Sequence, residues 1–498
     1  MRSLLFLCIF IIGQTLLCAQ DFNILDYGAK ADGITLNTVH IQSAIDAAHE
    51  NGGGRVLVPA GRFLSGSILL KSGVELHLLK DAVLLGSTNP EHYVKLIRWK
   101  ALIMSDSQNN ISITGRGEID GQGRPLALYI DSLFYAGQID STDYEFPEMR
   151  PKYHLRPHLI VFVQCTDIKI SNVTLQNSSS WVQTYDRCEN LMIDSVRVES
   201  DAYWNNDGVD ISDCRNVRIT NCSINSADDG ISLKSHSRGH SCDSIYIANC
   251  TVRSSASAIK LGARSYGGFR NVVIENIKVY DTFRSAVAIE CVDGGTLENV
   301  LVDNIQAVNT GNALFIRLGK RNATGSTGVL KNVTIKNIRV EVAFERPDYA
   351  YEMRGPALPF FHNIFPSSIT GIPGHPVENV ILENIEIHYP GRGNNGLAYM
   401  PLSRLDEVPE KIAEYPEFSM FGELPAWGFY VRHVDGLTLR NIKLSIEAPD
   451  YRPALVFDNV RNLDVTSMII RGDSKSGHII LYKTENVEID NEQAVIRM

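Results

Sequence analysis

One short pattern recurs through most of the chain and constrains its fold more than any other feature. A core residue is followed by any residue, then by Asn or a similar polar residue, then by alternating apolar positions, as in CRNVRI and FRNVVI. Most neighbouring units start 23 to 33 residues apart, a period that is typical of β-solenoids. One coil cannot bury its own apolar face, so the coils are expected to stack around a shared core. The units begin at Cys165, Cys188, Cys214, Cys242, Phe269, Leu297, Leu330, Val377, Val434, Val460 and Thr484.

The segments outside the regular coils fit the same architecture. Helical spacing in NTVHIQSAIDAAHENGGG, which ends in glycines, predicts a helix that caps the open N-terminal end of the stack. Two coils are much longer than the others and place loop inserts near 343–376 and 388–433, where specificity determinants commonly lie. We therefore predict an all-β fold in which residues 21–498 form a single solenoid domain.

The first residues predict export. Residues 1–20, MRSLLFLCIFIIGQTLLCAQ, combine Arg2, an apolar run and the small residue Ala19, as in a signal peptide. No later apolar run is long enough to span a bilayer, and the net charge of −10 argues against nucleic acid as a partner. We expect an exported monomer, periplasmic or extracellular.

Seven of the nine cysteines lie outside that N-terminal segment. Four of them, Cys165, Cys188, Cys214 and Cys242, occupy the same position in successive repeats. A stack of small buried residues in the core explains this ladder. Disulfides between adjacent coils are the alternative, since an exported protein permits them.

The stretch WNNDGVDISDCRNVRITNCSINSADDGISLKS, residues 204–235, gathers five aspartates in a strand-like region. Like charges that lie close together raise the free energy of a fold, so a purely structural segment would normally separate them. In the repeat register, DGVDI from Asp207 aligns with DGISL from Asp229, and Asp228 lies beside the second aspartate. The sequence therefore predicts three carboxylates in one patch.

Such a patch suits the hydrolysis of a glycosidic bond. One carboxyl group must hold a proton for the leaving oxygen while an ionised one activates water, and crowding separates their pKa values. In an inverting enzyme the two groups usually lie ~6.5–9.5 Å apart. The alternatives are solvated turn residues and a calcium site built from oxygen ligands. Asp210 and Asp213 are interpreted as ordinary strand or turn residues.

At these residues the chain resembles glycoside hydrolase family 28, the polygalacturonases and rhamnogalacturonan hydrolases that degrade pectin. NNDGVD looks like the family's N-T-D motif and SADDGISLKS like its D-D motif, and the resemblance runs from about Asp21 to about Val340. It implies a right-handed parallel β-helix and inverting hydrolysis without a metal or another cofactor. It also implies that Asp228 is the general acid and that Asp207 and Asp229 activate water.

Two departures from the family pattern affect the expected substrate. Ser257 stands where polygalacturonases have the histidine of G-H-G, and Ala288 and Glu290 stand where the arginine and lysine of R-I-K would bind a uronate carboxylate. Rhamnogalacturonan hydrolases also lack that histidine, so a galacturonate–rhamnose backbone is a further candidate. Other nearby cations, and one aromatic ring that could stack on a sugar, are the predicted substrate contacts: Lys260, Lys234, Arg264, Arg317, His236 and Trp181.

We therefore predict a secreted glycosidase that acts on galacturonate-containing pectic polysaccharide or oligosaccharide, with inserts that favour attack at chain ends. Two alternatives stay open. A pectin-type polysaccharide lyase would need calcium and a basic proton acceptor. A non-catalytic carbohydrate-binding β-helix protein would bind oligosaccharides without cleaving them.

Overall fold

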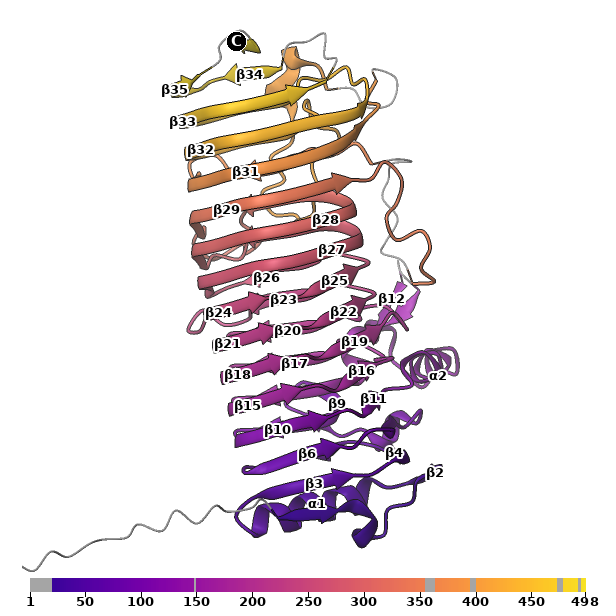
Figure 1. The fold of residues 1–498 in the computed structure, drawn as a ribbon. Helices are drawn as coiled ribbons and strands as arrows, with labels where there is room; N and C mark the ends of the chain where they lie inside the picture. The colour runs from indigo at the N-terminus through magenta and orange to yellow at the C-terminus, as the bar shows by residue number, and fades with distance from the viewer. Residues whose placement is uncertain (1–19, 147–148, 354–362, 395–399, 473–477, 491–493) are drawn as a thin grey trace, which may run out of the picture.

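The computed structural model describes residues 20–146, 149–353, 363–394, 400–472, 478–490 and 494–498. In this part of the chain the fold is built mainly from strands, so the all-β prediction is confirmed. The strands follow one another in coils that stack into a long column, with the N-terminal coils at one end and the C-terminal coils at the other (Figure 1). The predicted signal peptide lies outside the described residues except for residue 20.

Each coil contributes up to three strands, and each strand pairs in parallel with its equivalents on the coils before and after. The first ladder, which carries the candidate site, contains β5 (Ile68–Leu69), β9 (Trp99–Asp106), β14 (His158–Val163), β17 (Gln183–Asp186), β20 (Val209–Ser212), β23 (Ile231–Ser235), β26 (Ile259–Ser265), β30 (Ser367–Thr370), β34 (Ile479–Tyr482) and β36 (Val495–Arg497). The second contains β1 (Asp21–Asn23), β3 (Gly54–Val58), β6 (Val74–Leu78), β10 (Asn109–Gly115), β15 (Thr166–Ser171), β18 (Glu189–Asp194), β21 (Arg215–Thr220), β24 (Cys242–Ala248) and β35 (Glu485–Ile489). The third contains β2 (Asp32–Leu36), β4 (Gly61–Ser65), β7 (Ala82–Gly86), β11 (Glu118–Asp120), β16 (Thr174–Gln176), β19 (Arg197–Ser200), β22 (Ser223–Ser226) and β25 (Thr251–Ser254).

In the C-terminal half, longer strands turn the corners between ladders without interruption: β27 (Gly268–Cys291), β28 (Thr296–Leu318), β29 (Val329–Val342), β31 (Val377–Gly391), β32 (Phe429–Ala448) and β33 (Leu455–Arg471). Two strand pairs are antiparallel: β8 (Lys95–Leu96) pairs with β9 of the first ladder, and β12 (Tyr144–Glu145) pairs with β13 (Arg150–Pro151) outside the ladders. The helices are α1 (Thr38–Glu50), α2 (Gly123–Tyr135) and the short 3-10 helices η1 (Ile24–Tyr27), η2 (Pro90–His92), η3 (Ser141–Asp143), η5 (Tyr153–Leu155) and η6 (Leu402–Glu407).

The register of the first ladder is the one that the repeats predicted. Val209 pairs with Ile231, Ile231 with Ile259, Ile259 with Val287, and Val287 with Leu314. All five side chains are buried in the shared core. Because side chains alternate along a strand, the residues next to these point outward on the same face of every coil.

The cysteine ladder is part of that core. Cys165, Cys188, Cys214 and Cys242 are buried free thiols, and the Cys188 amide lies 3.3 Å from the Cys214 sulfur on the next coil. The same holds for the remaining three cysteines among the described residues, which are also free and buried. The core-stack interpretation is therefore correct, and disulfides between coils are absent from the described structure.

Asparagines form a ladder of their own near the start of successive strands of the second ladder. Asn271, Asn299, Asn332 and Asn379 all have positive φ angles, near +52° to +58°, a conformation that asparagine adopts more readily than most residues. The side-chain amides of Asn299, Asn332 and Asn379 donate to the equivalent asparagine one coil earlier, over 3.3, 3.4 and 3.2 Å, and that of Asn271 donates to Asp243 over 2.8 Å. The recurring Asn of the sequence is thus a turn ladder.

Helix α1 and two long loops depart from the regular coils. Four residues of α1, Ile41, Ala44, Ile45 and Ala48, are buried, and the helix packs on β1, β3, β5 and β6 at the N-terminal end of the stack (Figure 1). The long loops leave β29 after Val342 and β31 after Gly391, and the chain rejoins the first ladder at β30 and β32. Among the described residues, no helix is long and apolar enough to cross a membrane.

Candidate active site

Asp207 and Asp229 occupy the same position on neighbouring coils, as the register predicted. Each comes two residues before a strand of the first ladder, β20 or β23, and the Gly208 amide donates to the Asp229 carbonyl over 2.9 Å. A Cβ atom on Gly208 would lie only 2.6 Å from the Gly230 carbonyl oxygen. The glycine after each aspartate is therefore required by the close approach of the coils.

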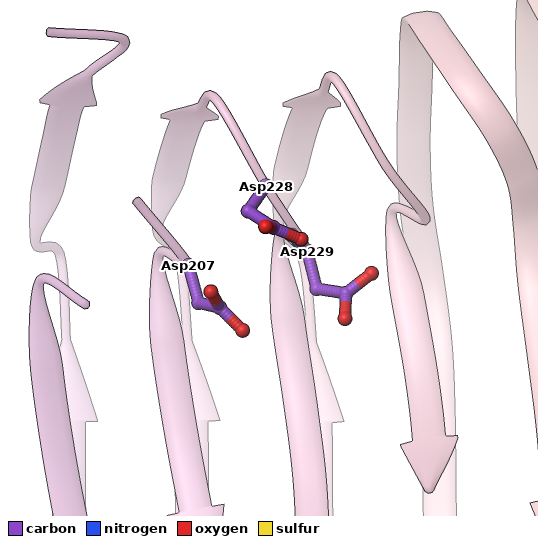
Figure 2. Close-up of side chains that lie close together, drawn as sticks. All are labelled: Asp207, Asp228 and Asp229. Atoms are coloured by element: carbon purple, nitrogen blue, oxygen red, sulfur yellow. The ribbon is translucent and has the colours of Figure 1, made fainter. Parts of the chain in front are cut away.

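Asp228 completes the cluster from the turn that precedes β23. Its backbone carbonyl accepts hydrogen bonds from the Ser226 and Ser254 hydroxyls, over 2.8 and 2.6 Å, and its Oδ1 accepts from the Asp229 amide over 2.9 Å. One carboxylate oxygen each of Asp207, Asp228 and Asp229 lies within 4.8 Å of the other two, and the side chains project from the same side of the stack (Figure 2). Asp207 and Asp229 are buried, whereas Asp228 is partly exposed. Asp228 is thus the carboxyl group that is most open to a substrate.

A lysine from the following coil pairs with each buried aspartate. Lys234 Nζ donates to Asp207 Oδ2 over 2.8 Å and also forms an ion pair with Asp210. Lys260 Nζ donates to Asp229 Oδ2 over 2.9 Å. The two lysines are only 6% and 2% exposed. Both were predicted as substrate contacts, and both lie at the aspartates, where their charges are already paired.

The electrostatic surroundings of the two stacked aspartates differ. Burial, followed by the neighbouring charge of Asp210, raises the pKa of Asp207 above its ordinary value, although Lys234 acts against this. Burial also favours the neutral form of Asp229, but nearby cations, of which Lys260 is the strongest, outweigh it and lower its pKa. Burial raises the pKa of Asp210 to about 6. Of Asp207, Asp210 and Asp229, only Asp229 is therefore an aspartate whose surroundings favour the ionised form.

Trp181 lies beside this network, on the coil before Asp207. Lys234 Nζ sits 4.4 Å from the centre of the Trp181 ring, which is within the range of a cation–π contact. Tyr153 stacks on Trp181 with ring centres 5.4 Å apart and an interplanar angle of 10°. The predicted aromatic residue thus borders the candidate site, within an aromatic cluster.

Two of the other predicted contacts lie farther along the strands. Arg264 is exposed near the end of β26, and His236 is partly exposed just after β23. Neither ring nitrogen of His236 has a hydrogen-bond partner among the described residues. Burial, and then the charge of Arg98, lowers the pKa of His236 to about 3, so the ring is neutral. Of these two residues, only Arg264 offers a positive charge at the surface.

Arg317 does not face the aspartates. It is buried, and its guanidinium donates to the backbone carbonyls of Gly371, Glu410 and Lys411 over 2.9, 2.6 and 3.1 Å. Burial lowers its pKa to about 10. The observed contacts hold the second insert against the coil, and they engage the guanidinium that was predicted to contact the substrate.

The second insert also brings residues to the site that the sequence did not reveal. The Tyr415 hydroxyl accepts a hydrogen bond from Lys260 Nζ over 3.0 Å, and Glu417 forms an ion pair with the partly buried Arg284 at 2.9 Å. Glu290 is buried nearby, and burial raises its pKa to about 8. Glu290 was noticed in the sequence only as a departure from R-I-K. Nothing in the repeat register places the insert residues, because the insert has no repeat.

The fold and the site together describe a carbohydrate-active enzyme scaffold with a carboxylate centre. The family model of glycosyl hydrolases family 28 matches residues 50–346, and the chain belongs to this family. It is similar to a probable polygalacturonase of Vitis vinifera, with 33% identity over 44% of this chain and 45% of that protein. It is also similar to an exo-poly-alpha-D-galacturonosidase of Dickeya chrysanthemi, with 30% identity over 42% of this chain and 41% of that protein. The chain thus spans less than half the length of these curated relatives.

Solved structures support the fold. The family 28 exopolygalacturonase of Yersinia enterocolitica aligns with a TM-score of 0.62 at 20% identity, over 95% of this chain and 79% of that one. A hyperthermoactive exopolygalacturonase from Thermotoga maritima aligns with a TM-score of 0.60 at 23% identity, over 74% and 87%. At these identities the likeness concerns the backbone architecture.

Proposed function

We propose that the protein is a glycosidase that hydrolyses a galacturonate-containing pectic chain. The observation that carries this proposal is the cluster of Asp207, Asp228 and Asp229, whose carboxylate oxygens lie within 4.8 Å of one another. In the proposed reaction, Asp228 gives its proton to the glycosidic oxygen as the bond to the anomeric carbon breaks. Water attacks that carbon and loses a proton to the aspartate pair. Family membership and the names of the curated relatives support pectin as the substrate.

Inversion of the anomeric centre is part of the proposal. The usual separation in inverting enzymes is ~6.5–9.5 Å between the acid and the base, and here one oxygen of each carboxylate lies closer than that, within 4.8 Å. The water is therefore proposed to bind beside Asp207 and Asp229 together, on the flank of the cluster. Two carboxylates on one flank leave Asp228 alone to face the leaving oxygen.

We further propose that the enzyme acts at chain ends. The second insert reaches the coils after Asp229 through Tyr415 and Glu417. In the turn that precedes β26, the Ser255 hydroxyl donates to the Met353 carbonyl of the first insert over 3.0 Å. Loops that close over consecutive coils on one side would leave a blind end, which favours binding of a terminus over the middle of a polymer.

The finer structural expectations are proposed with the function. We infer that the stack is a right-handed solenoid capped by α1, whose apolar side faces β3 and β6. We also infer that the mature protein is an exported monomer. Enzymes that act on polymers too large to enter a cell have to meet them outside.

Product analysis tests the proposed function. The protein is incubated, with a chelator present, separately with polygalacturonan and with a debranched rhamnogalacturonan backbone. New saturated reducing ends that accumulate as one small product would support chain-end hydrolysis. Unsaturated products that need calcium would identify a lyase, and tight binding without cleavage of either polymer would identify a binding protein. A rapid loss of viscosity would contradict action at chain ends.

A further inference from the structure

We propose that Lys234 and Lys260 are positioning residues that give the stacked aspartates different tasks. Lys260 holds Asp229 as the carboxylate that accepts the proton of the attacking water, whereas Lys234 holds Asp207 together with Asp210 so that Asp207 orients that water. This inference rests on the proposed hydrolytic function. It replaces the expectation from the sequence that both lysines contact a uronate of the substrate.

Both ammonium groups are engaged inside the protein. An ammonium has three N–H donors, and Lys260 Nζ uses two of them, on Asp229 at 2.9 Å and on the Tyr415 hydroxyl at 3.0 Å. Lys234 Nζ bonds to Asp207 and Asp210 and lies over the Trp181 ring. A sugar carboxylate that displaced the aspartate from either lysine would leave that aspartate buried and unpaired, which is strongly unfavourable.

The register explains why the two aspartates are not equivalent. Asp210 is opposite Ser232 on the next coil, and Ser232 is opposite Lys260 on the coil after that. Lys234 is opposite Ser212 and so lies two residues farther along its strand. As a result, Lys234 is shared by two carboxylates.

Lys260, in contrast, forms an ion pair with a single carboxylate among the described residues, Asp229. One cation between Asp207 and Asp210 cannot stabilise two full negative charges as well as Lys260 stabilises one. The directions of the pKa changes agree, since that of Asp207 is raised and that of Asp229 is lowered.

The reaction balances with these assignments. The proton of Asp228 passes to the glycosidic oxygen as the bond from that oxygen to the anomeric carbon breaks. The water oxygen forms the new bond to the anomeric carbon, and its proton passes to Asp229. Asp228 is left ionised and Asp229 protonated until solvent exchanges the proton. The charged or titratable groups around Asp229 are Lys260, Lys234, Arg284, Asp228, Asp207, Asp210, Glu290 and Tyr415.

The test compares Lys260→Met and Lys234→Met with Lys331→Met, which removes a lysine that pairs with Glu298 on the surface at 3.3 Å. The values of kcat and KM are measured against pH on an acidic oligogalacturonide and on its methyl ester. We expect Lys260→Met to shift the acidic limb of the pH profile of kcat/KM to higher pH by about one pH unit or more. On that limb this lowers kcat/KM by about tenfold, equally for both substrates. We expect Lys234→Met to lower kcat with the limb in place, and Lys260→Arg to restore the limb in part.

A rise in KM for the acidic substrate alone, with the limb unmoved, would overturn the inference, because the lysines would then bind the substrate carboxylate. If the wild-type protein cleaves neither substrate, the proposed function fails and the inference is judged on the free protein. Carboxyl-carbon NMR of aspartate-labelled protein, with the Asp229 signal assigned by Asp229→Asn, should show a higher titration midpoint in Lys260→Met and Lys260→Arg intermediate. A midpoint that is the same as in Lys331→Met would refute it.

Discussion

Replacing Glu290 by glutamine should change how the stability of the protein depends on pH. Glu290 is 2% exposed, its Oε2 has no hydrogen-bond partner among the described residues, and burial raises its pKa from 4.5 to about 8. An acid whose pKa is raised in the folded state keeps its proton while the unfolded chain releases one. Stability is therefore lost as the pH rises from 4.5 to 8. At about 1.4 kcal/mol per pH unit, the free energy of unfolding falls by at most about 5 kcal/mol across this pH window.

The assay is urea unfolding of wild-type protein and Glu290→Gln at several pH values across that window. We expect the free energy of unfolding of the wild type to fall relative to the variant by a few kcal/mol towards pH 8. At the acidic end the variant should be the less stable protein, by about 1–3 kcal/mol, because a buried amide N–H lacks a partner. Glu378→Gln, at an exposed position on β31, is the matched control. Parallel curves for wild type and Glu290→Gln would refute the reasoning, since Glu290 would then ionise alike in the folded and unfolded chains.

Three further outcomes are expected. Asp228→Asn should lower kcat by about 10²–10⁴-fold, as loss of a general acid does, with an unchanged circular dichroism spectrum; normal turnover would remove Asp228 from the mechanism. Gly230→Ala should lower the free energy of unfolding by about 1–3 kcal/mol through overpacking, because the added Cβ would lie 2.6 Å from the Ala258 carbonyl oxygen. Gly239→Ala, with open space around it, should cost little. Equal melting temperatures of the two variants would contradict the close stacking. Proton NMR of the first product should show inversion at the anomeric carbon, and a retained configuration would mean that one aspartate acts as a nucleophile.

The stacking of the aspartates could be predicted because it follows from a period in the sequence. Once the repeats are aligned, Asp207 and Asp229 must be neighbours, since coils of a solenoid lie one strand spacing apart. The same argument predicted the buried cysteine ladder. The same residue pattern recurs in every coil, so a wrong assignment of one residue does not change the predicted register.

The charge network around the aspartates was harder to predict. Asp210 was interpreted as an ordinary strand residue, yet it bonds to Lys234 inside the site. The available signal was the alternation along β20 and β23, which turns both residues outward on one face. Alternation does not determine whether an outward lysine points to solvent or folds back on a carboxylate. That choice depends on the burial of the whole group, which only the packed structure defines.

The contacts of the insert residues could not be predicted from the sequence, because the inserts do not share the repeat of the coils. Tyr415 contacts Lys260 across 155 residues of sequence, through a loop whose path is fixed by Arg317 and by contacts such as the Glu417–Arg284 ion pair. The register of the coils can be read from the repeats in the sequence. A loop of this length has many possible paths, and its contacts in the folded protein select one of them. The proton transfers depend on the coils, and access to them depends on the loops. It follows that relatives with the same aspartates can differ in the substrates they accept, and that substitutions in the inserts should alter substrate choice before they alter the chemistry.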